Sequence, residues 1–428
     1  MISGDKEQIN KKYFFAYLAF LSVGVINFGY FVSECSSLSE PEEVLYFLST
    51  YFAKLFGNIL SGVFPRASKR RKMLISNIII IIFSATLSIF GERSKLSMNM
   101  LSALIGIGFG ITATTLPFFL KEIAPKEYQK TALISFGVMV FVGIQLNGIA
   151  SYIVTIHELD GHLWLFLFPS LLSSIQLLLQ LIMFRDDTPK WLANNSLEEE
   201  AVMVIAKFYH STDRRIKEYN ILQINTANYK LQWPTYTELF TGQNLNNLLK
   251  GMVVLLARNA TEDFILTDLE MAANDLTLFV SLCVTAIFIA ITVFILANKL
   301  SMRKAFVIGG IPLALIMIGF IVMDIIGLVT EFKDYELFTN IFIAMKWVVH
   351  SLFISPFCFM YAIKLLPERG FTLLIAFHWI SFLLLHLPYI FVFDSGRISL
   401  MLIMSCLFAA CVIPFVVLIF KESKGLEL

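Results

Sequence analysis

Aromatic and amide side chains lie inside several long apolar segments of the chain, and their types suit the binding of a hydroxyl-rich solute. Each hydroxyl group needs a donor or acceptor, and a flat ring can cover one face of such a solute. The aromatic candidates are Trp379 and Phe359, and the polar candidates are His378, Asn27, Gln145 and Asn259. A lone amide in an apolar helix also bonds neighbouring helices, so that structural role stays open beside solute binding.

Ionisable side chains inside apolar segments form a second set of candidates, because hydrocarbon does not solvate charge. Arg258 and Glu262 are four residues apart, as are Lys346 and His350, so each pair shares a helical face. Glu262 could also reach Lys346. A structural ion pair and a binding site for a charged solute both remain open. For Lys54, which stands alone in an apolar segment, we expect snorkelling or a local partner.

The composition restricts the class of protein that these residues can serve. The chain has 428 residues, of which 57% are hydrophobic and 15% are charged, too few charges to cover a soluble surface. A soluble enzyme, a nucleic-acid binder and a disordered scaffold are therefore excluded. No nucleophile–base arrangement, phosphate-binding loop or metal-spaced cluster is present, so we expect no enzymatic activity, cofactor or metal.

Apolar runs long enough to cross a bilayer, roughly 20 residues each, recur along the chain. We predict them near 13–33, 44–64, 73–91, 97–120, 130–154, 163–184, 275–297, 304–328, 337–363, 370–393 and 398–420. The basic loops stay on one side only if a further helix crosses near 251–270, despite its charges. The sequence therefore predicts an all-α membrane protein with twelve transmembrane helices and both termini in the cytosol.

Short landmarks repeat in the same order in the two parts of the chain. The basic loop after the second span matches the loop after the eighth, and similar matches follow the fourth and tenth spans and the sixth and twelfth. The repeat predicts two parallel six-helix halves with a solute site between them. We expect an N-terminal bundle at 1–184, a cytosolic helical linker at 185–247 and a C-terminal bundle at 248–428.

Two specific motifs are a glycine-rich run from Gly106 to Gly110 that is followed by Glu122-Ile-Ala-Pro125, and a tail motif that begins at Glu422. Together with shorter motifs along the whole chain, they resemble the sugar porter family of the major facilitator superfamily. The resemblance implies the major facilitator fold and the transport of a hexose or related sugar by alternating access. It also supports Trp379 and Phe359 as residues of the sugar site. Phe31 stands where proton-coupled members carry an aspartate, which favours a facilitator, while Glu34, three residues later, stays open as a substitute for that aspartate.

Charged residues at the predicted cytosolic ends suggest a gate. We expect Arg66, Arg70 and Arg71 to bridge to Glu122 when the inner side is closed. Arg185 and Glu422 stand at matching points of the two halves and are expected to join this gate. Because Pro65 and Lys364 stand where the family has carboxylates, we expect a weakened network.

Two other functions stay open at this stage. One is a carrier of a charged organic metabolite that uses Arg258, Glu262 and Lys346, and the other is a transporter-like sensor or scaffold without flux. As a carrier, the protein is expected to act as a monomer in the lipid bilayer of the plasma membrane, with no nucleic-acid partner.

Overall fold

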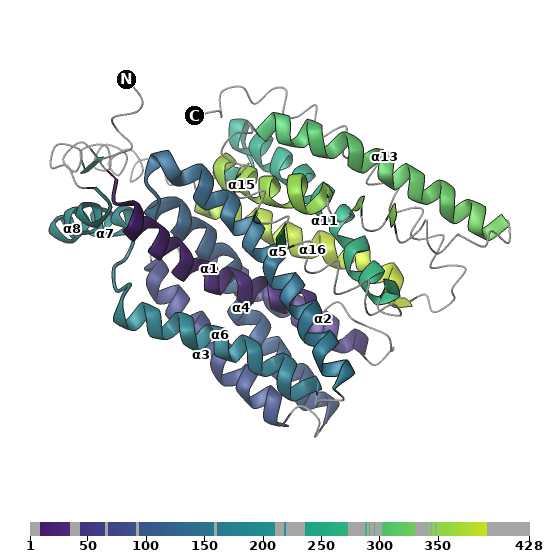
Figure 1. The fold of residues 1–428 in the computed structure, drawn as a ribbon. Helices are drawn as coiled ribbons and strands as arrows, with labels where there is room; N and C mark the ends of the chain where they lie inside the picture. Colours follow the sequence, from purple (N-terminus) through teal and green to yellow (C-terminus); the bar gives the residue numbers. More distant parts are fainter. Residues whose placement is uncertain are drawn as a thin grey trace.

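The computed structural model describes residues 9–34, 43–64, 67–90, 94–157, 161–209, 218–219, 236–272, 287–288, 291, 295, 302–329, 341–342, 345–346 and 349–391. Within these ranges long helices dominate, and an isolated antiparallel bridge joins Ile9 to Tyr209. Figure 1 shows the helices of the first half packed beside those of the second half.

The described residues of the first half form six long helices. They are α1 (Lys11–Glu34), α2 (Glu43–Val63), α3 (Lys69–Phe90), α4 (Lys95–Ile123), α5 (Lys126–Ile156) and α6 (Gly161–Ile182). Each lies at one of the first six predicted spans, with boundaries that extend one to four residues beyond most predicted ends. A continuous apolar run in the sequence is therefore a sufficient signal for these helices.

Short helices follow in the predicted linker, and further helical elements follow in the described part of the second half. The short ones are α7 (Pro189–Asn194), α8 (Glu198–Phe208) and α10 (Tyr236–Leu239). The later ones are α11 (Gly242–Ala272), α13 (Met302–Val329), a π-helical turn η3 (His350–Ile354) that runs into α15 (Ser355–Leu365), and α16 (Glu368–Phe391). The predicted span near 398–420, most of the span near 275–297 and part of the span near 337–363 lie outside the described residues.

Six of the described helices are long and apolar enough to cross a membrane, judged by length and composition. They contain the segments Lys11–Phe31, Lys69–Phe90, Leu96–Ile123, Lys126–Ala150, Leu163–Ile182 and Glu368–Leu385. The predicted crossing at 251–270 lies within α11, which is one continuous helix of 31 residues. The division of the chain at residues 184 and 247 stays a prediction.

Helix α2 shows how these helices distribute polar and apolar side chains. Phe52, Phe56 and Ile59 are exposed at helical spacing along its outer face, while Lys54 and Asn58 are fully buried on the inner face. A helix on the surface of a water-soluble protein shows the opposite distribution, with apolar side chains inward and polar side chains outward. The exposed apolar face of α2 therefore indicates apolar surroundings of the bundle. The arrangement fits a helix whose outer face contacts lipid.

Close packing of α2 against α4 depends on small residues. A Cβ atom added at Gly110 would lie 2.1 Å from the carbonyl oxygen of Lys54, so only glycine fits at this crossing. The glycine-rich run of the sequence therefore serves helix packing, as is common between membrane helices.

Candidate functional site

Helices of the two halves meet along one interface. Helix α2 packs on α16, and α5 packs on α15 (Figure 1). At the second contact, a Cβ atom added at Gly137 would lie 2.4 Å from the Cα atom of Pro356. At the first contact, the side-chain amide of Asn58 donates to the carbonyl oxygen of Thr372 over 3.0 Å. The interface is therefore tight where these helices cross.

Trp379 occupies the middle of this interface and is 1% exposed. Its ring meets Phe28 of α1 edge-on at 6.0 Å and Tyr51 of α2 edge-on at 5.8 Å, measured between ring centroids. His378 lies beside it at 4.8 Å. One aromatic side chain of the second half is thus surrounded by rings from the first half.

Helix α11 brings Arg258 and Asn259 to the same region. The guanidinium of Arg258 lies 4.5 Å from the centroid of the Phe359 ring, and its Nε donates to Ser355 Oγ over 3.2 Å. The amide of Asn259 donates to the carbonyl oxygen of His378 over 2.9 Å. Because Phe359 also contacts the His378 ring at 6.0 Å, these residues form one connected group with Trp379.

Several buried polar atoms in this group have no hydrogen-bond partner within the described part of the chain. They are Nε1 of Trp379, Nδ1 of His378 and Oδ1 of Asn259. Buried polar atoms are normally paired, and leaving one unpaired costs free energy. A solute with several hydroxyl groups would supply the missing partners.

Lys54 reaches the same group from the first half. Its side chain is fully buried, with Nζ 4.0 Å from the centroid of Tyr51, 5.1 Å from that of Phe31 and 5.4 Å from that of Trp379. Snorkelling, one of the two expectations for this residue, is wrong. The other expectation, a local partner, is confirmed, because Tyr51 lies three residues earlier on α2 and its ring contacts the ammonium.

The remaining predicted binding residues have different surroundings. Asn27 donates to the carbonyl oxygen of Pro169 and to Ser173 Oγ in α6, over 3.1 and 2.8 Å, so it joins two helices of the first half. Gln145 is 1% exposed, and both of its amide atoms lack partners among the described residues. Lys346 is buried, and the side chain of Glu262 lies outside the described residues.

A second group of charged side chains joins the two halves at one end of the bundle, where α3 and α16 begin. Glu368 of α16 binds Lys69 Nζ at 3.1 Å and Lys72 Nζ at 3.2 Å. Lys69 also binds Glu122 of α4 at 3.1 Å. We call Lys69, Lys72, Glu122 and Glu368 the ionic lattice. All four side chains are at most 8% exposed, so their charges are strongly coupled.

The lattice differs from the predicted gate in its basic residues. The described partners of Glu122 are Lys69, Lys190 at 3.9 Å and the Thr188 hydroxyl at 2.8 Å, so the expected bridges from Arg70 and Arg71 are wrong. The reason is the start of α3 at Lys69, which puts residues 69 and 72 on one face and turns Arg71 outward.

Of the other predicted gate residues, Arg185 lies within the described part of the chain. Arg185 is exposed, and its Nε donates to the carbonyl oxygen of Leu181 in its own helix, so its expected part in the network is not seen. Arg66 and Glu422 lie outside the described residues. The expectation of a network short of carboxylates is also revised, because Glu368, four residues after Lys364 and at the start of the next helix, supplies one.

Asp187 holds the start of α3 against the segment after α6. One of its carboxylate oxygens accepts a hydrogen bond from the Ser68 hydroxyl, and the other accepts from the backbone N–H of Arg70 over 3.2 Å. Burial raises the pKa of the Asp187 carboxyl above 3.8, and the two hydrogen bonds oppose that rise. The contact fixes the helix end that carries Lys69.

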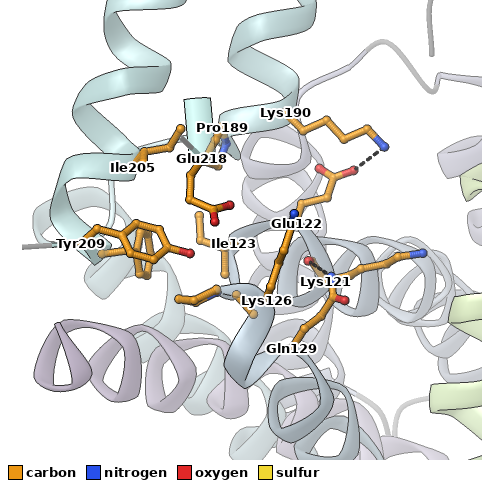
Figure 2. A pocket seen from close by; sticks show the side chains of 13 residues that line it. Lys121, Glu122, Ile123, Lys126, Gln129, Pro189, Lys190, Ile205, Tyr209 and Glu218 are labelled. Atoms are coloured by element: carbon orange, nitrogen blue, oxygen red, sulfur yellow. Dashed lines mark hydrogen bonds and ion pairs between the residues drawn. The ribbon is translucent and has the colours of Figure 1, made fainter. Parts of the chain in front are cut away.

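A cavity of about 230 Å³ lies beside the lattice, between the α4–α5 turn and the linker helices (Figure 2). Glu122 faces Lys190 on one side of it, and Tyr209 and Glu218 lie on the other side. Nearby, the backbone N–H of Asn10 donates to the carbonyl oxygen of Phe208 over 2.8 Å. The linker helices therefore pack against the lattice end of the bundle.

Comparison with known proteins gives one consistent result. A family model described as "Sugar (and other) transporter" matches residues 11–428. The proton myo-inositol cotransporter hmit-1.1 of Caenorhabditis elegans is 28% identical over 191 residues, which is 44% of this chain and 30% of that protein. The glucose transporter GlcP of Staphylococcus epidermidis is 26% identical over 202 residues, 46% of this chain and 44% of that protein. The matched stretches thus span less than half of these relatives.

Solved structures match over almost the whole chain. The proton:xylose symporter XylE, bound to 6-bromo-6-deoxy-D-glucose, superposes with a TM-score of 0.81 at 12% identity and covers 96% of both chains. The inward open conformation of XylE from E. coli superposes with a TM-score of 0.71 at 14% identity, over 94% of this chain and 95% of that one.

Proposed function

The chain belongs to the sugar transporter family, and from this premise we propose that it carries a hexose or a related small sugar across a membrane by alternating access. Its fold is that of the major facilitator superfamily. Both the family and the fold are those of integral, multi-pass membrane transporters, which are not enzymes.

The observation that carries the proposal is the surroundings of Trp379. This ring belongs to the second half but packs against Phe28 and Tyr51 of the first half. Beside it, Asn259 and His378 present polar atoms without partners within the described ranges. A sugar stacked on the indole would satisfy these atoms, and its contacts would change when the halves move. We therefore assign sugar contact to Trp379, His378, Phe359 and Asn259, and propose the same for Gln145.

Not every predicted binding residue keeps that assignment. Asn27 is better explained as a structural bond between α1 and α6, because its amide donates to two groups of α6. Glu262 and Lys346 stay predicted contacts of a charged solute.

The ionic lattice supports alternating access. Its ion pairs between Glu368 and the two lysines of α3 cross from one half to the other at a single end of the bundle. They can persist only while that end is closed. Rocking of the halves must break them, so they favour the state in which the opposite end is accessible. We propose that the lattice end faces the cytosol together with both termini.

We further propose that the carrier is a facilitator without proton coupling. Phe31 is fully buried and stacks on Phe109, with ring centroids 4.4 Å apart. A phenylalanine cannot take up a proton at this position. Uptake should therefore be insensitive to a pH gradient. The plasma membrane as location and the monomeric state stay predictions.

The test is counterflow in proteoliposomes made with the purified full chain. Vesicles are loaded with an unlabelled sugar and diluted into traces of the same labelled sugar, using glucose, xylose, myo-inositol and the sugar acid glucuronate in turn. The proposal expects transient accumulation of at least one of them. Absence of accumulation for all four refutes it. Binding without accumulation supports the sensor function instead.

A further inference from the structure

Helix α16 brings three aromatic rings against the first half. Phe371 meets Phe118 of α4 edge-on, with 5.3 Å between ring centroids, and Phe382 stacks on Tyr51 of α2 at 4.9 Å with the ring planes 10° apart. Trp379, the ring of the proposed sugar site, comes between them in the sequence. We call Phe118 and Phe371 the lattice-side pair, and Tyr51 and Phe382 the far-side pair. Each pair joins one half of the bundle to the other.

The two pairs lie on opposite sides of Trp379 along the helix axis. Helix α16 begins at Glu368 in the ionic lattice, and each further residue advances the helix by about 1.5 Å. Measured from Glu368 along the axis, Phe371 is therefore roughly 5 Å away, Trp379 roughly 16 Å and Phe382 roughly 21 Å. The indole thus lies between the lattice-side pair and the far-side pair.

The rings of both pairs are buried, with exposed fractions of at most 4%, and Trp379 is 1% exposed. In this structure the indole is therefore covered by rings on the lattice side and on the far side. Lys121 of α4 adds a contact to the lattice-side pair. Its Nζ lies 5.3 Å from the centroid of Phe118 and donates to the carbonyl oxygen of Ile363 in α15 over 2.8 Å.

Contacting rings have the properties that a movable barrier needs. Two buried rings in contact exclude solute from the space that they fill, because protein interiors are close-packed. When the rings separate, their contact exposes apolar surface and breaks no hydrogen bond. A ring contact is therefore easier to break than a buried ion pair, whose separation leaves two charges unpaired. If the rings only filled the interface, removing one of them would loosen both sides alike.

We propose that the far-side pair, Tyr51 with Phe382, closes the sugar site on the side opposite to the ionic lattice, and that the lattice-side pair closes it on the lattice side. The inference rests on the proposed function, since it assigns the two barriers of the same site. The pairs separate in turn when the halves rock, and the sugar passes the pair that has separated. Each ring pair thus controls access from one side only.

The experiment measures from which side a cysteine in the site can be reached. The reporter is Ser381→Cys in the full chain, in a background that carries serine in place of the five native cysteines. Ser381 is 4% exposed, and its Oγ accepts a hydrogen bond from the Asn259 amide over 2.6 Å, so the reporter lies in the sugar site. A charged, membrane-impermeant thiol reagent is applied to right-side-out and to inside-out vesicles. Labelling of a separate Ser61→Cys protein identifies the lattice side in the same preparations.

Removing one ring should open one side. Phe382→Ala should raise the labelling rate from the far side roughly fivefold, the shift expected for the loss of one aromatic pair, and leave the lattice-side rate within about twofold. Phe371→Ala should show the reverse. Ile380→Ala, on the exposed face of α16, is the matched control and should change neither rate. An unchanged far-side rate in Phe382→Ala, or an equal rise on both sides, overturns the inference.

Two further measurements keep the outcomes distinct. If an alanine variant is not monodisperse, Phe382→Leu and Phe371→Leu remove the ring while keeping an apolar side chain, and they should show the same difference between the sides. Sugar counterflow by the unsubstituted protein is measured in parallel. Counterflow without the expected difference in labelling overturns the inference and leaves the proposed function intact. No counterflow of any tested sugar overturns both.

Discussion

Neutralising Glu368 should open the lattice end of the bundle. In Glu368→Gln, the ion pairs to Lys69 and Lys72 lose their charge, although Lys69 still faces Glu122 and Lys72 still donates to the carbonyl oxygen of Ser61. Lys69 and Lys72 therefore each keep another partner in the variant, and the substitution weakens mainly the contact between the halves.

The size of the expected shift follows from the ion pairs of Glu368 with Lys69 and Lys72. A hydrogen bond to a charged group contributes about 1.5–3 kcal/mol, and glutamine keeps one acceptor for the two lysines. We take the net loss as one such bond, about 2 kcal/mol. Since 1.4 kcal/mol corresponds to a factor of ten, the ratio of open to closed states at this end should rise roughly 30-fold.

The assay is maleimide labelling of a single cysteine at Ser61, which is 5% exposed and lies in α2 near the lattice. The background carries serine in place of the five native cysteines. If labelling requires opening, its rate in Glu368→Gln should rise roughly 30-fold, in proportion to the open population. Glu198→Gln, at an exposed glutamate of α8, is the control. A rate that stays within about twofold of the parent, or an equal rise in the control, refutes the reasoning.

Three further outcomes follow from the structure. Trp379→Ala should lower counterflow of the transported sugar by roughly fivefold or more, because loss of a stacked ring at the interface costs about 1 kcal/mol or more; unchanged counterflow contradicts the site. Gly137→Val should abolish transport while leaving expression in place, since its side chain collides with Pro356 only when the halves close; wild-type rates would exclude the close contact. The pKa of Asp187 is raised above 3.8 in the folded protein. Between pH 3.8 and the folded pKa, the folded protein therefore binds more protons than the unfolded chain, so the free energy of unfolding falls as pH rises through that window. Thermal melts in detergent should show this slope in the wild type and lose it in Asp187→Asn.

The helices of the first half were predictable, because an apolar run of bilayer length has few alternatives. Helix α1 was expected at 13–33 and lies at Lys11–Glu34. The start of α3 was harder to predict, because its first turn is basic and resembles a loop in the sequence. Its start at Lys69 decides which cations face Glu122, so the lattice partners could not be inferred without it.

The central group was predictable only in part. Trp379, His378, Phe359 and Asn259 were all expected from residue type and family resemblance, and the structure brings them together. The place of Lys54 was not foreseen, because single-sequence patterns give the depth of a residue in its helix but not which neighbouring helix it faces. Its contact with Trp379 depends on the crossing of α2 and α16.

The relative movement of the two halves is tested most directly by a reversible lock. A Cβ atom at Gly62 of α2 would lie 3.1 Å from the Cβ atom of Thr372 of α16, close to the separation of about 3.5–4.5 Å across a disulfide. Gly62→Cys with Thr372→Cys, in the background without native cysteines, should cross-link under oxidation. The account predicts that the oxidised protein binds sugar but does not exchange it, and that reduction restores exchange. Full exchange by a completely cross-linked protein would contradict alternating access.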